Sequence, residues 1–574
     1  MQELGGHVER EFETVAADVL VVGGGGAACR AAIEAGKTSR CVIAVDGVFG
    51  RAGTTTTGMG GMNVALGNFD SRDNWEVHYE DTIKGGQFIN NQELVEIFSK
   101  EGLERIYDLE QYGMLFHRMD NGRIAQRRES GSTYHRTCMT GDRTGHELQR
   151  TLTREVQRRR IPVFEEVVVA ALLVEDGSVA GALGLDFRSG RFLVFRAPAV
   201  VMATGGCVRL YEICSNAHES TGDGVGMAHR AGAALIDMEM VQFHPTGMVF
   251  PESGKGLLVS EAVRGDGGQL INSEGERFMT RYSPDWMELA TRDVVARAIW
   301  SEVTQGRGSP HGGVYLDISH VPAQEIEVRL PLMLRQLLRT GIDIRKEAME
   351  VLPTPHFMCG GIRIDAEAAT TLPGLFAGGE TAGGVHGANR LGANSFTDLQ
   401  VFGARAGRSA AYYAAGQQRK ASASQVKHLV AELSAPLDRA EGTSPISLRK
   451  RLQKLMYQSV GIVRNRQGLE SARTELMGMK TDGIPVMSVA GSPRYNYALV
   501  ESIKIRNMVE TALAIAECAL KREESRGVHF REDFPQQDPS WLANIIVSRC
   551  GSEMRTEVVE VVASSTHPVV ASTA

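Results

Sequence analysis

Four residues near the N-terminus have the types and spacing of a site for nucleotide phosphates. Gly23, Gly25 and Ala28 form a G-x-G-x-x-A pattern, and Asp46 follows 23 residues after the first glycine. The first glycine permits a tight turn, the second lets a pyrophosphate approach the backbone, and the small third residue lets a helix pack closely on a strand. An acid at the position of Asp46 can bind a ribose hydroxyl. The pattern predicts a dinucleotide site without deciding between NAD and FAD.

The elements around these residues support that prediction. Residues 18–22 and 41–45 are short apolar runs typical of buried strands, and residues 30–35 between them have a helical pattern. The order strand, helix, strand predicts parallel strands in an α/β sheet. The glycine turn then lies at the start of the helix, whose N-terminus favours phosphate.

Glycine is over-represented in the chain, and its distribution indicates the cofactor. It accounts for 64 of the 574 residues, or about 11% against a usual level of about 7%. Only 18 prolines and no G-X-Y repeat are present, which excludes collagen and low-complexity chains. Glycines recur after two further apolar runs, at 204–206 and 378–379. Several glycine-rich strand ends are typical of flavoproteins, so we expect FAD.

Composition excludes several other classes of protein. Lys and Arg number 62 against 69 Asp and Glu, a net charge of −7, and no long basic run indicates nucleic-acid binding. The eight cysteines are scattered without a C-x-x-C, so we expect no zinc or iron–sulfur site and a reducing compartment. Residues 1–18 are polar, which predicts no secretory signal. No apolar run reaches about 18 residues, so we expect no membrane span.

Ten further segments occur together in a characteristic order. They are GGMNVALGN (60–68), DRTGH (142–146), NAH (216–218), TGDG (221–224), MEMVQFHPTG (238–247), RGDGG (264–268), GERFM (275–279), RDVVAR (292–297), HGANRLGANS (386–395) and SRGVH (525–529). With these segments the chain resembles the flavoprotein subunits of succinate dehydrogenase and fumarate reductase, together with the related L-aspartate oxidases. The resemblance covers about residues 18–535.

The resemblance implies a fold and a division into domains. We expect an α/β FAD-binding (Rossmann-like) domain with an inserted α+β capping domain, followed by a C-terminal helical domain. The FAD-binding domain is expected in two parts, 1–243 and 353–415, interrupted by the capping domain at 244–352. The helical domain is expected at 416–535 and a C-terminal extension at 536–574.

The resemblance also assigns the contacts to FAD. By position these are Gly23, Gly25, Ala28, Asp46, Gly53, Thr54, Thr55, Gly60, Gly61, Asp223, Glu380, Asn394 and Ser395. Membrane-bound members of the family hold FAD covalently through a histidine six residues before the paired glycines. Thr54 occupies that position here. We therefore predict non-covalent FAD, which favours fumarate reduction or oxidase chemistry over succinate oxidation.

The family reaction interconverts a C4 dicarboxylate and its 2,3-alkene. It requires cationic and hydrogen-bonding groups that hold both carboxylates in a closed site. The matching substrate positions are His244, His356, Arg390, Ser260 where the family usually has Thr, and Phe116 as an aromatic residue near the substrate.

The proton on carbon is assigned, by resemblance, to Arg292. A guanidinium is a poor base, but a carbanion-like centre formed in the reductive direction is basic enough to take its proton. Glu261 and Arg264 occupy the matching Glu-x-x-Arg positions of a relay that returns the proton to Arg292.

Two residues depart from the dehydrogenase pattern and leave other substrates open. Met59 stands where a glutamine usually precedes the paired glycines. Glu129 stands where L-aspartate oxidases have a glutamate associated with the substrate ammonium. The alternatives are an L-aspartate oxidase that forms iminoaspartate, an enzyme for another substituted dicarboxylate, and a flavin-binding scaffold without catalysis. The retained histidines and arginines argue against the scaffold.

Partners and location follow from the same resemblance. The chain has no iron–sulfur ligand set of its own, so electrons are expected to pass through a partner iron–sulfur subunit. A membrane anchor or a thiol- or quinone-linked subunit is a further expectation. We expect the chain in the cytoplasm, peripheral to the inner face of the cytoplasmic membrane where such partners hold it there.

Overall fold

The computed structural model describes residues 12–129, 131–417, 421–551 and 553–571. Most of the N-terminal segment for which we predict no secretory signal, residues 1–11, lies outside the described residues. Among the described helices, none is both long and apolar enough to cross a membrane.

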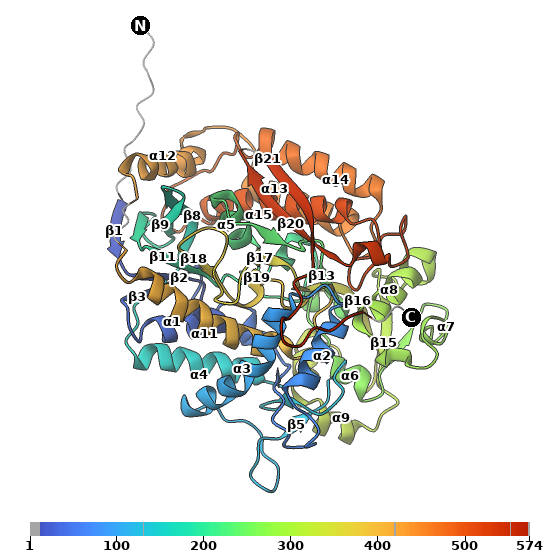
Figure 1. Ribbon diagram of the computed structural model, residues 1–574. Helices are drawn as coiled ribbons and strands as arrows, with labels where there is room; N and C mark the ends of the chain where they lie inside the picture. The colour runs from blue at the N-terminus through green and yellow to red at the C-terminus, as the bar shows by residue number, and fades with distance from the viewer. Residues whose placement is uncertain (1–11, 130, 418–420, 552, 572–574) are drawn as a thin grey trace.

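A five-stranded parallel sheet forms the centre of the molecule. Its order is β18 (Leu375–Ala377), β11 (Ala199–Met202), β2 (Val19–Val22), β3 (Cys41–Val45) and β7 (Val163–Glu165). Helix α1 (Gly26–Ala35) connects β2 to β3 and packs against the long helix α11 (Asn394–Ala414) (Figure 1). Gly407 permits this contact, because a Cβ there would lie 2.1 Å from the carbonyl oxygen of Ala31. The predicted βαβ unit is present.

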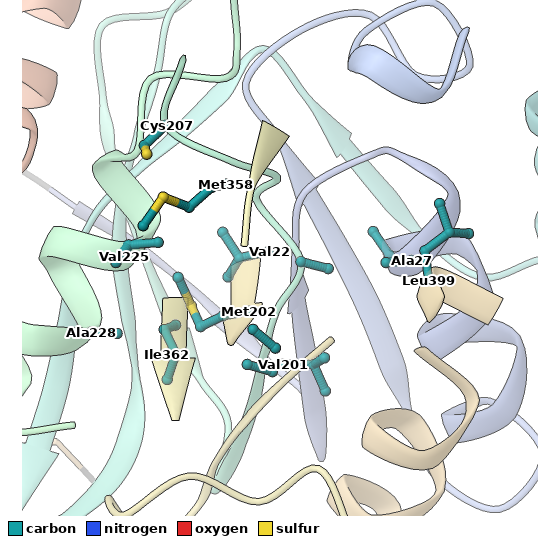
Figure 2. Close-up of a cluster of buried hydrophobic side chains, with 14 of the residues drawn as sticks. Val22, Ala27, Val201, Met202, Cys207, Val225, Ala228, Met358, Ile362 and Leu399 are labelled. Carbon is teal, nitrogen blue, oxygen red and sulfur yellow. The ribbon is translucent and has the colours of Figure 1, made fainter. Parts of the chain in front are cut away.

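Further elements cover this sheet. A four-stranded sheet has the order β1 (Phe12–Ala16), β10 (Phe192–Arg196), β9 (Ser178–Asp186) and β8 (Val167–Glu175). Helices α2 (Trp75–Gly85), α3 (Gln92–Gln111) and α4 (Thr144–Arg158) lie in the part of the chain between β3 and β7, with the small sheet β4 (Met62–Asn63), β6 (Thr137–Cys138) and β5 (Gln126–Arg127). Figure 2 shows Met202 of the central sheet on the side of Val225 and Ala228 of α5 (Asp223–Ala231). These three residues are buried, so the core continues from the sheet into α5.

An inserted unit contributes a second sheet with its own hydrophobic core. The sheet order is β13 (Val241–Phe250), β16 (Met349–Met358), β15 (Val314–Asp317) and β14 (Gln269–Ile271), all antiparallel. Its helices are α6 (Glu261–Gly265), α7 (Met279–Tyr282), α8 (Arg292–Glu302), α9 (Ala323–Arg329) and α10 (Pro331–Thr340). They lie together on the right in Figure 1. The expected domain limits, 244 and 352, fall inside β13 and β16.

The C-terminal part is mainly helical and lies across the top of Figure 1. It contains α12 (Ala423–Ser434), α13 (Pro445–Ser459), α14 (Arg466–Gly478) and α15 (Tyr497–Lys521). Helix α15 is buried along most of its length and contacts α5, α13 and α14. The chain then forms the hairpin β20 (Ala543–Cys550) and β21 (Glu553–Glu560), which extends the sheet of β19 (Ala382–Gly383), β17 (Gly361–Arg363) and β12 (Leu235–Ile236). The predicted α/β domain, inserted α+β unit and C-terminal helical region are all confirmed.

Candidate active site

A cavity of about 1340 Å³ is lined by both the parallel-sheet domain and the inserted unit. Gly23, Asp46 and Gly378, at the carboxyl ends of β2, β3 and β18, line one part of it. His244 of β13 and Arg292 of α8 line another part. Ligands bind at the carboxyl ends of parallel strands in such sheets, so the cavity is the candidate active site.

The backbone around Gly23 and α1 fits a dinucleotide. Gly23 has a φ of 122°, and a Cβ at this position would lie 2.2 Å from the carbonyl oxygen of Ala203. Helix α1 has no side-chain cap at Gly25, and Oγ1 of Thr55 accepts a hydrogen bond from the N–H of Gly26 at 3.2 Å. The positive end of the helix dipole thus faces the cavity. These residues fit the pyrophosphate of FAD.

Most predicted FAD contacts line this one cavity. They are Gly23, Gly25, Asp46, Gly53, Thr54, Thr55, Gly60, Gly61, Asp223, Glu380 and Ser395. Ala28 does not line it, since its side chain is buried inside α1, where a small residue serves close packing. The side chain of Asn394 is also directed elsewhere: its Oδ1 accepts from Nδ2 of Asn63 at 2.8 Å and its Nδ2 donates to Oγ1 of Thr82 at 3.1 Å. Asn394 therefore holds the chain beside the cavity and does not itself line it.

Two of the predicted cofactor contacts, Thr54 and Glu380, have polar partners of their own within the protein. The hydroxyl of Thr54 lies 2.9 Å from the hydroxyl of Ser220. The carboxylate of Glu380 accepts a hydrogen bond from the N–H of Met358 at 3.0 Å. Burial raises the pKa of Glu380 to about 7, so this carboxyl titrates near neutral pH inside the cavity.

Lys504, from a distant part of the chain, contacts a residue that lines the cofactor end of the cavity. Its Nζ lies 2.5 Å from Oδ2 of Asp46, although 458 residues separate the two. Burial alone would lower the pKa of Lys504, but Asp46 and Asp223 outweigh it and raise the pKa above its usual value. Nothing in the local sequence of α15 distinguishes this lysine as a site residue, and it was not predicted from the sequence.

At the other end of the cavity two histidines face each other from neighbouring strands. The rings of His244 (β13) and His356 (β16) have centroids 5.4 Å apart. Nδ1 of His244 accepts a hydrogen bond from the N–H of Thr246 at 3.3 Å, and Nδ1 of His356 lies 3.0 Å from the hydroxyl of Ser215. Burial is the main cause that holds the pKa of His244 well below its usual value, and the charge of Arg292 is the next. Burial is also the main cause that holds the pKa of His356 well below its usual value, and His244 is the next. Both imidazoles are neutral at pH 7.

Two arginines beside the histidines share one amide. Oε1 of Gln242 accepts from Nη2 of Arg390 at 3.1 Å and from Nη1 of Arg292 at 3.5 Å. Its Nε2 donates to the carbonyl oxygen of Arg390 at 2.8 Å and to Oδ1 of Asn389 at 2.7 Å. Because a carbonyl only accepts and a guanidinium only donates, these partners fix the orientation of the amide. Gln242 lies inside the MEMVQFHPTG segment, but no role was assigned to it from the sequence.

Arg390 is buried and has unused hydrogen-bonding capacity. Burial, followed by the charge of Arg292, lowers the pKa of Arg390 to about 10, so it remains charged at pH 7. Its Nε has no hydrogen-bond partner within the described residues. A buried, charged donor of this kind fits a carboxylate ligand.

Glu261 connects Arg292 to a more deeply buried arginine. Nε of Arg292 donates to Oε2 of Glu261 at 3.0 Å, and Nη2 of Arg264 lies 3.8 Å from the same oxygen. Burial would raise the pKa of Glu261, but Arg292 and Arg264 outweigh it and hold the pKa below its usual value. Arg292 and Glu261 line the cavity, whereas Arg264 lies behind Glu261. The three predicted relay residues are therefore brought together in line.

The other predicted substrate contacts have different outcomes. Ser260 lines the cavity, and its Oγ accepts from the N–H of Ala262 at 3.3 Å at the start of α6. Glu129 lines it too, but its Oε1 is held by Nε of Arg127 at 2.7 Å. Phe116 does not line the cavity and is buried in the main hydrophobic core.

The local backbone explains the position of Phe116. Met114 and Phe116 are buried while Leu115 and His117 are exposed, so the side chains alternate along an extended segment. His117, the next residue, lines the cavity. The structure thus places His117, and not Phe116, in the lining of the cavity, and the substrate contact of Phe116 stays a prediction.

No metal centre is evident in the described part of the chain. No group of three or more His, Cys, Asp or Glu side chains there is placed to hold a metal ion. All eight cysteines are free, and seven of them are buried.

Two family models match the chain. The model described as FAD binding domain matches residues 18–396, and the model described as fumarate reductase flavoprotein C-term matches residues 449–572. The first of these spans well over half of the chain. Together they cover both the parallel-sheet domain with its inserted unit and most of the C-terminal region.

Individual relatives match over nearly the whole chain. The A subunit of the fumarate reductase (CoM/CoB) of Methanothermobacter marburgensis is 48% identical over 543 residues, covering 94% of this chain and 98% of the relative. The solved structure of Mycobacterium smegmatis Sdh1 superposes with a TM-score of 0.89 at 43% identity, covering 96% of this chain and 95% of that one. The E. coli quinol fumarate reductase FrdA chain gives 0.91 at 32% identity, covering 97% and 99%. The predicted resemblance is confirmed: the chain belongs to the flavoprotein family of fumarate reductases and succinate dehydrogenases, and is an FAD-dependent oxidoreductase.

Proposed function

We propose that this chain is the flavoprotein subunit of an enzyme that interconverts fumarate and succinate, with Arg292 as the proton shuttle. The observation that carries the proposal is the contact chain from Arg292 in the cavity through Glu261 to the buried Arg264. Bound FAD supplies hydride transfer to or from the dicarboxylate at its N5. The residues below supply binding, orientation and the proton.

The charge of the substrate end favours a dianion. Arg264, Arg292 and Arg390 contribute three positive charges and Glu261 one negative charge, which leaves two positive charges. His244 and His356 are neutral and can donate hydrogen bonds without adding charge. Two net positive charges beside a partly closed cavity match the two carboxylates of a C4 dicarboxylate.

In the proposed mechanism Arg292 transfers a proton and Glu261 restores it. In fumarate reduction, hydride addition leaves a carbanion-like centre, and a proton from the guanidinium of Arg292 completes succinate. The ionised carboxylate of Glu261 stabilises the charged guanidinium before the transfer and forms the path by which a proton returns. Nη2 of Arg264 lies 3.8 Å from the carboxylate oxygen that accepts from Arg292, and it adds a second positive charge beside it.

We further propose that FAD is bound without a covalent link. Thr54 has no nucleophilic ring nitrogen, and its hydroxyl contacts the hydroxyl of Ser220. Acid precipitation of the purified holoprotein tests this: free flavin should remain in the supernatant. Flavin that stays with the denatured pellet would contradict the proposal.

The L-aspartate oxidase alternative receives less support from the geometry. It depends on a free carboxylate at Glu129 for the substrate ammonium. Arg127 forms an ion pair with Glu129 at 2.7 Å, so that charge is already neutralised. The residues of the cavity favour fumarate and succinate over an amino acid. A related enzyme for another substituted dicarboxylate remains compatible with Met59, which lines the cavity.

The electron partner is proposed to be an iron–sulfur subunit, in turn linked to a membrane anchor or to a thiol- or quinone-linked subunit. The Methanothermobacter relative is named as one subunit of its fumarate reductase, and the described cysteines of this chain form no cluster site. Affinity purification of this chain from its native cells, followed by iron and acid-labile sulfide analysis, tests the partner. A flavoprotein recovered alone, with full activity toward a physiological donor, would contradict it.

Cell fractionation would test the proposed cytoplasmic location, peripheral to the membrane.

A further inference from the structure

The cofactor end of the cavity contains a group of three charges from three separate parts of the chain, a buried lysine and two partly exposed acids. Asp46 follows β3 of the central sheet, Asp223 is the first residue of α5, and Lys504 lies in the N-terminal half of α15. Nζ of Lys504 is 2.5 Å from Oδ2 of Asp46. Only 8% of Lys504 is exposed, so this is an interior ion pair between the helical region and the central sheet.

The two acids face the cavity, whereas the lysine does not line it. Asp46 and Asp223 are both lining residues. Burial raises the pKa of Asp223, Lys504 opposes this, and Asp46 adds to it. The two carboxylates therefore repel each other, and the ammonium of Lys504 offsets that repulsion.

Three other titratable groups lie near this site: Glu501, His218 and Glu219, which lines the cavity and accepts from the N–H of Gly53 at 3.3 Å. Glu501, one turn earlier on α15, is paired with Arg449. Arg209 and partial burial lower the pKa of His218, so this imidazole is neutral at pH 7. Oδ1 of Asp223 also accepts from the hydroxyl of Thr221 at 2.7 Å. Lys504 is thus the cation that balances the two acids.

We propose that Lys504 is a cofactor-positioning residue, which holds Asp46 and Asp223 as paired acceptors for the adenosine-ribose hydroxyls of FAD. Carboxylates at these strand and helix ends accept hydrogen bonds from ribose. Because Lys504 belongs to α15, the adenosine end of the FAD site is complete only when the helical region is docked. The inference uses FAD binding alone and does not depend on which substrate is reduced.

FAD titration of apoprotein, prepared from the purified holoprotein, tests this role by flavin fluorescence. Lys504→Met should raise the FAD dissociation constant about 10- to 100-fold, the range expected for losing one charge-assisted interaction. Lys504→Arg keeps the charge and should stay within about threefold of wild type. Lys480→Met is the matched control, because Lys480 pairs with Glu510 in the same region but does not line or approach the cavity acids.

A charge-rescue variant separates cofactor positioning from simple packing. The wild-type site carries two negative charges and one positive charge, a net charge of −1. Lys504→Met combined with Asp46→Asn has the same net charge and should recover most of the lost FAD affinity. The affinity of Lys504→Met alone should improve as pH falls from 8 to 6, because a proton on one acid replaces the missing positive charge. The wild-type affinity should change much less over that range.

Three results would overturn the proposal. One is wild-type FAD affinity in folded Lys504→Met. Another is a double variant that binds FAD no better than Lys504→Met. The third is a large loss of FAD affinity in folded Lys504→Arg, because this variant keeps the positive charge. This third test remains available if Lys504→Met does not fold.

Discussion

Nε of Arg292 donates a hydrogen bond to Oε2 of Glu261 at 3.0 Å, across the gap between two helices of the inserted unit. Glu261 begins α6 and Arg292 begins α8, so both side chains project from helix N-termini toward the same cavity. This contact joins the residue that we propose as proton donor to the residue that we propose returns its proton, and four predictions concern its surroundings.

Replacing Arg292 with alanine should remove the proton donor while leaving the cofactor site intact. We expect turnover of fumarate to fall about 10²- to 10⁴-fold, the usual contribution of a positioned acid. FAD content should be unchanged, because Arg292 is not among the cofactor contacts. Arg297→Ala is the control: Arg297 lies on the same helix, pairs with Asp293, and does not line the cavity. Activity retained in Arg292→Ala would reject the proton role.

Replacing Glu261 with glutamine should interrupt the relay with little change of shape. The amide cannot carry the negative charge that the lowered pKa of Glu261 maintains at neutral pH. We expect turnover to fall about 10- to 100-fold and the solvent deuterium isotope effect on turnover to increase, because proton return becomes slower. An unchanged isotope effect, with turnover close to wild type, would show that protons reach Arg292 by another path.

Replacing Gln242 with methionine should separate the two substrate-facing arginines from their shared acceptor. Both arginines donate to Gln242, and in the proposed mechanism Arg390 holds the substrate while Arg292 delivers the proton, so both KM and kcat should then worsen. The expected loss in kcat/KM is about tenfold, as for two weak hydrogen bonds. Gln126→Met is a matched control, because Gln126 is also buried and is bonded to Val64 and Asn68 away from the cavity. Equal losses in both variants would indicate a general packing effect.

The two neutral histidines predict how stability depends on pH. The pKa values of His244 and His356 are lowered in the folded chain, so the unfolded chain binds more protons as pH falls below about 6.5. Above that pH the two neutral histidines do not lower the free energy of unfolding. Below it, the free energy of unfolding falls by up to about 1.4 kcal/mol per pH unit for each histidine. Thermal unfolding from pH 7.5 to 5 measures this. His356→Gln should show a shallower decline than wild type, and an equal slope would contradict the assignment.

Local patterns predicted the glycine turn and the glycine-rich strand ends that line one end of the cavity. The G-x-G-x-x-A turn and the glycine-rich strand ends depend on backbone requirements that only a few residue types meet, as the 2.2 Å approach at Gly23 illustrates. The relay residues were found because the resemblance assigned whole motifs. Arg292, Glu261 and Arg264 do lie together, although no periodicity or spacing links positions 261 and 292.

Contacts that depend on packing between distant elements could not be predicted. Lys504 meets Asp46 only because α15 is buried against the core of the molecule. Phe116 is buried because side chains alternate between the core and the surface along an extended loop. The same alternation directs the next residue, His117, toward the cavity. Gln242 lies in a recognisable motif, but its hydrogen bonds come from two arginines that approach it from other segments.

The most direct test of the account is an assay of the purified holoprotein with two substrates in parallel. Fumarate should be reduced to succinate with reduced viologen as electron donor, and L-aspartate should not be oxidised with oxygen as acceptor. Arg292→Ala, with full FAD content, should lose the fumarate activity. Turnover of L-aspartate without turnover of fumarate or succinate would contradict the account.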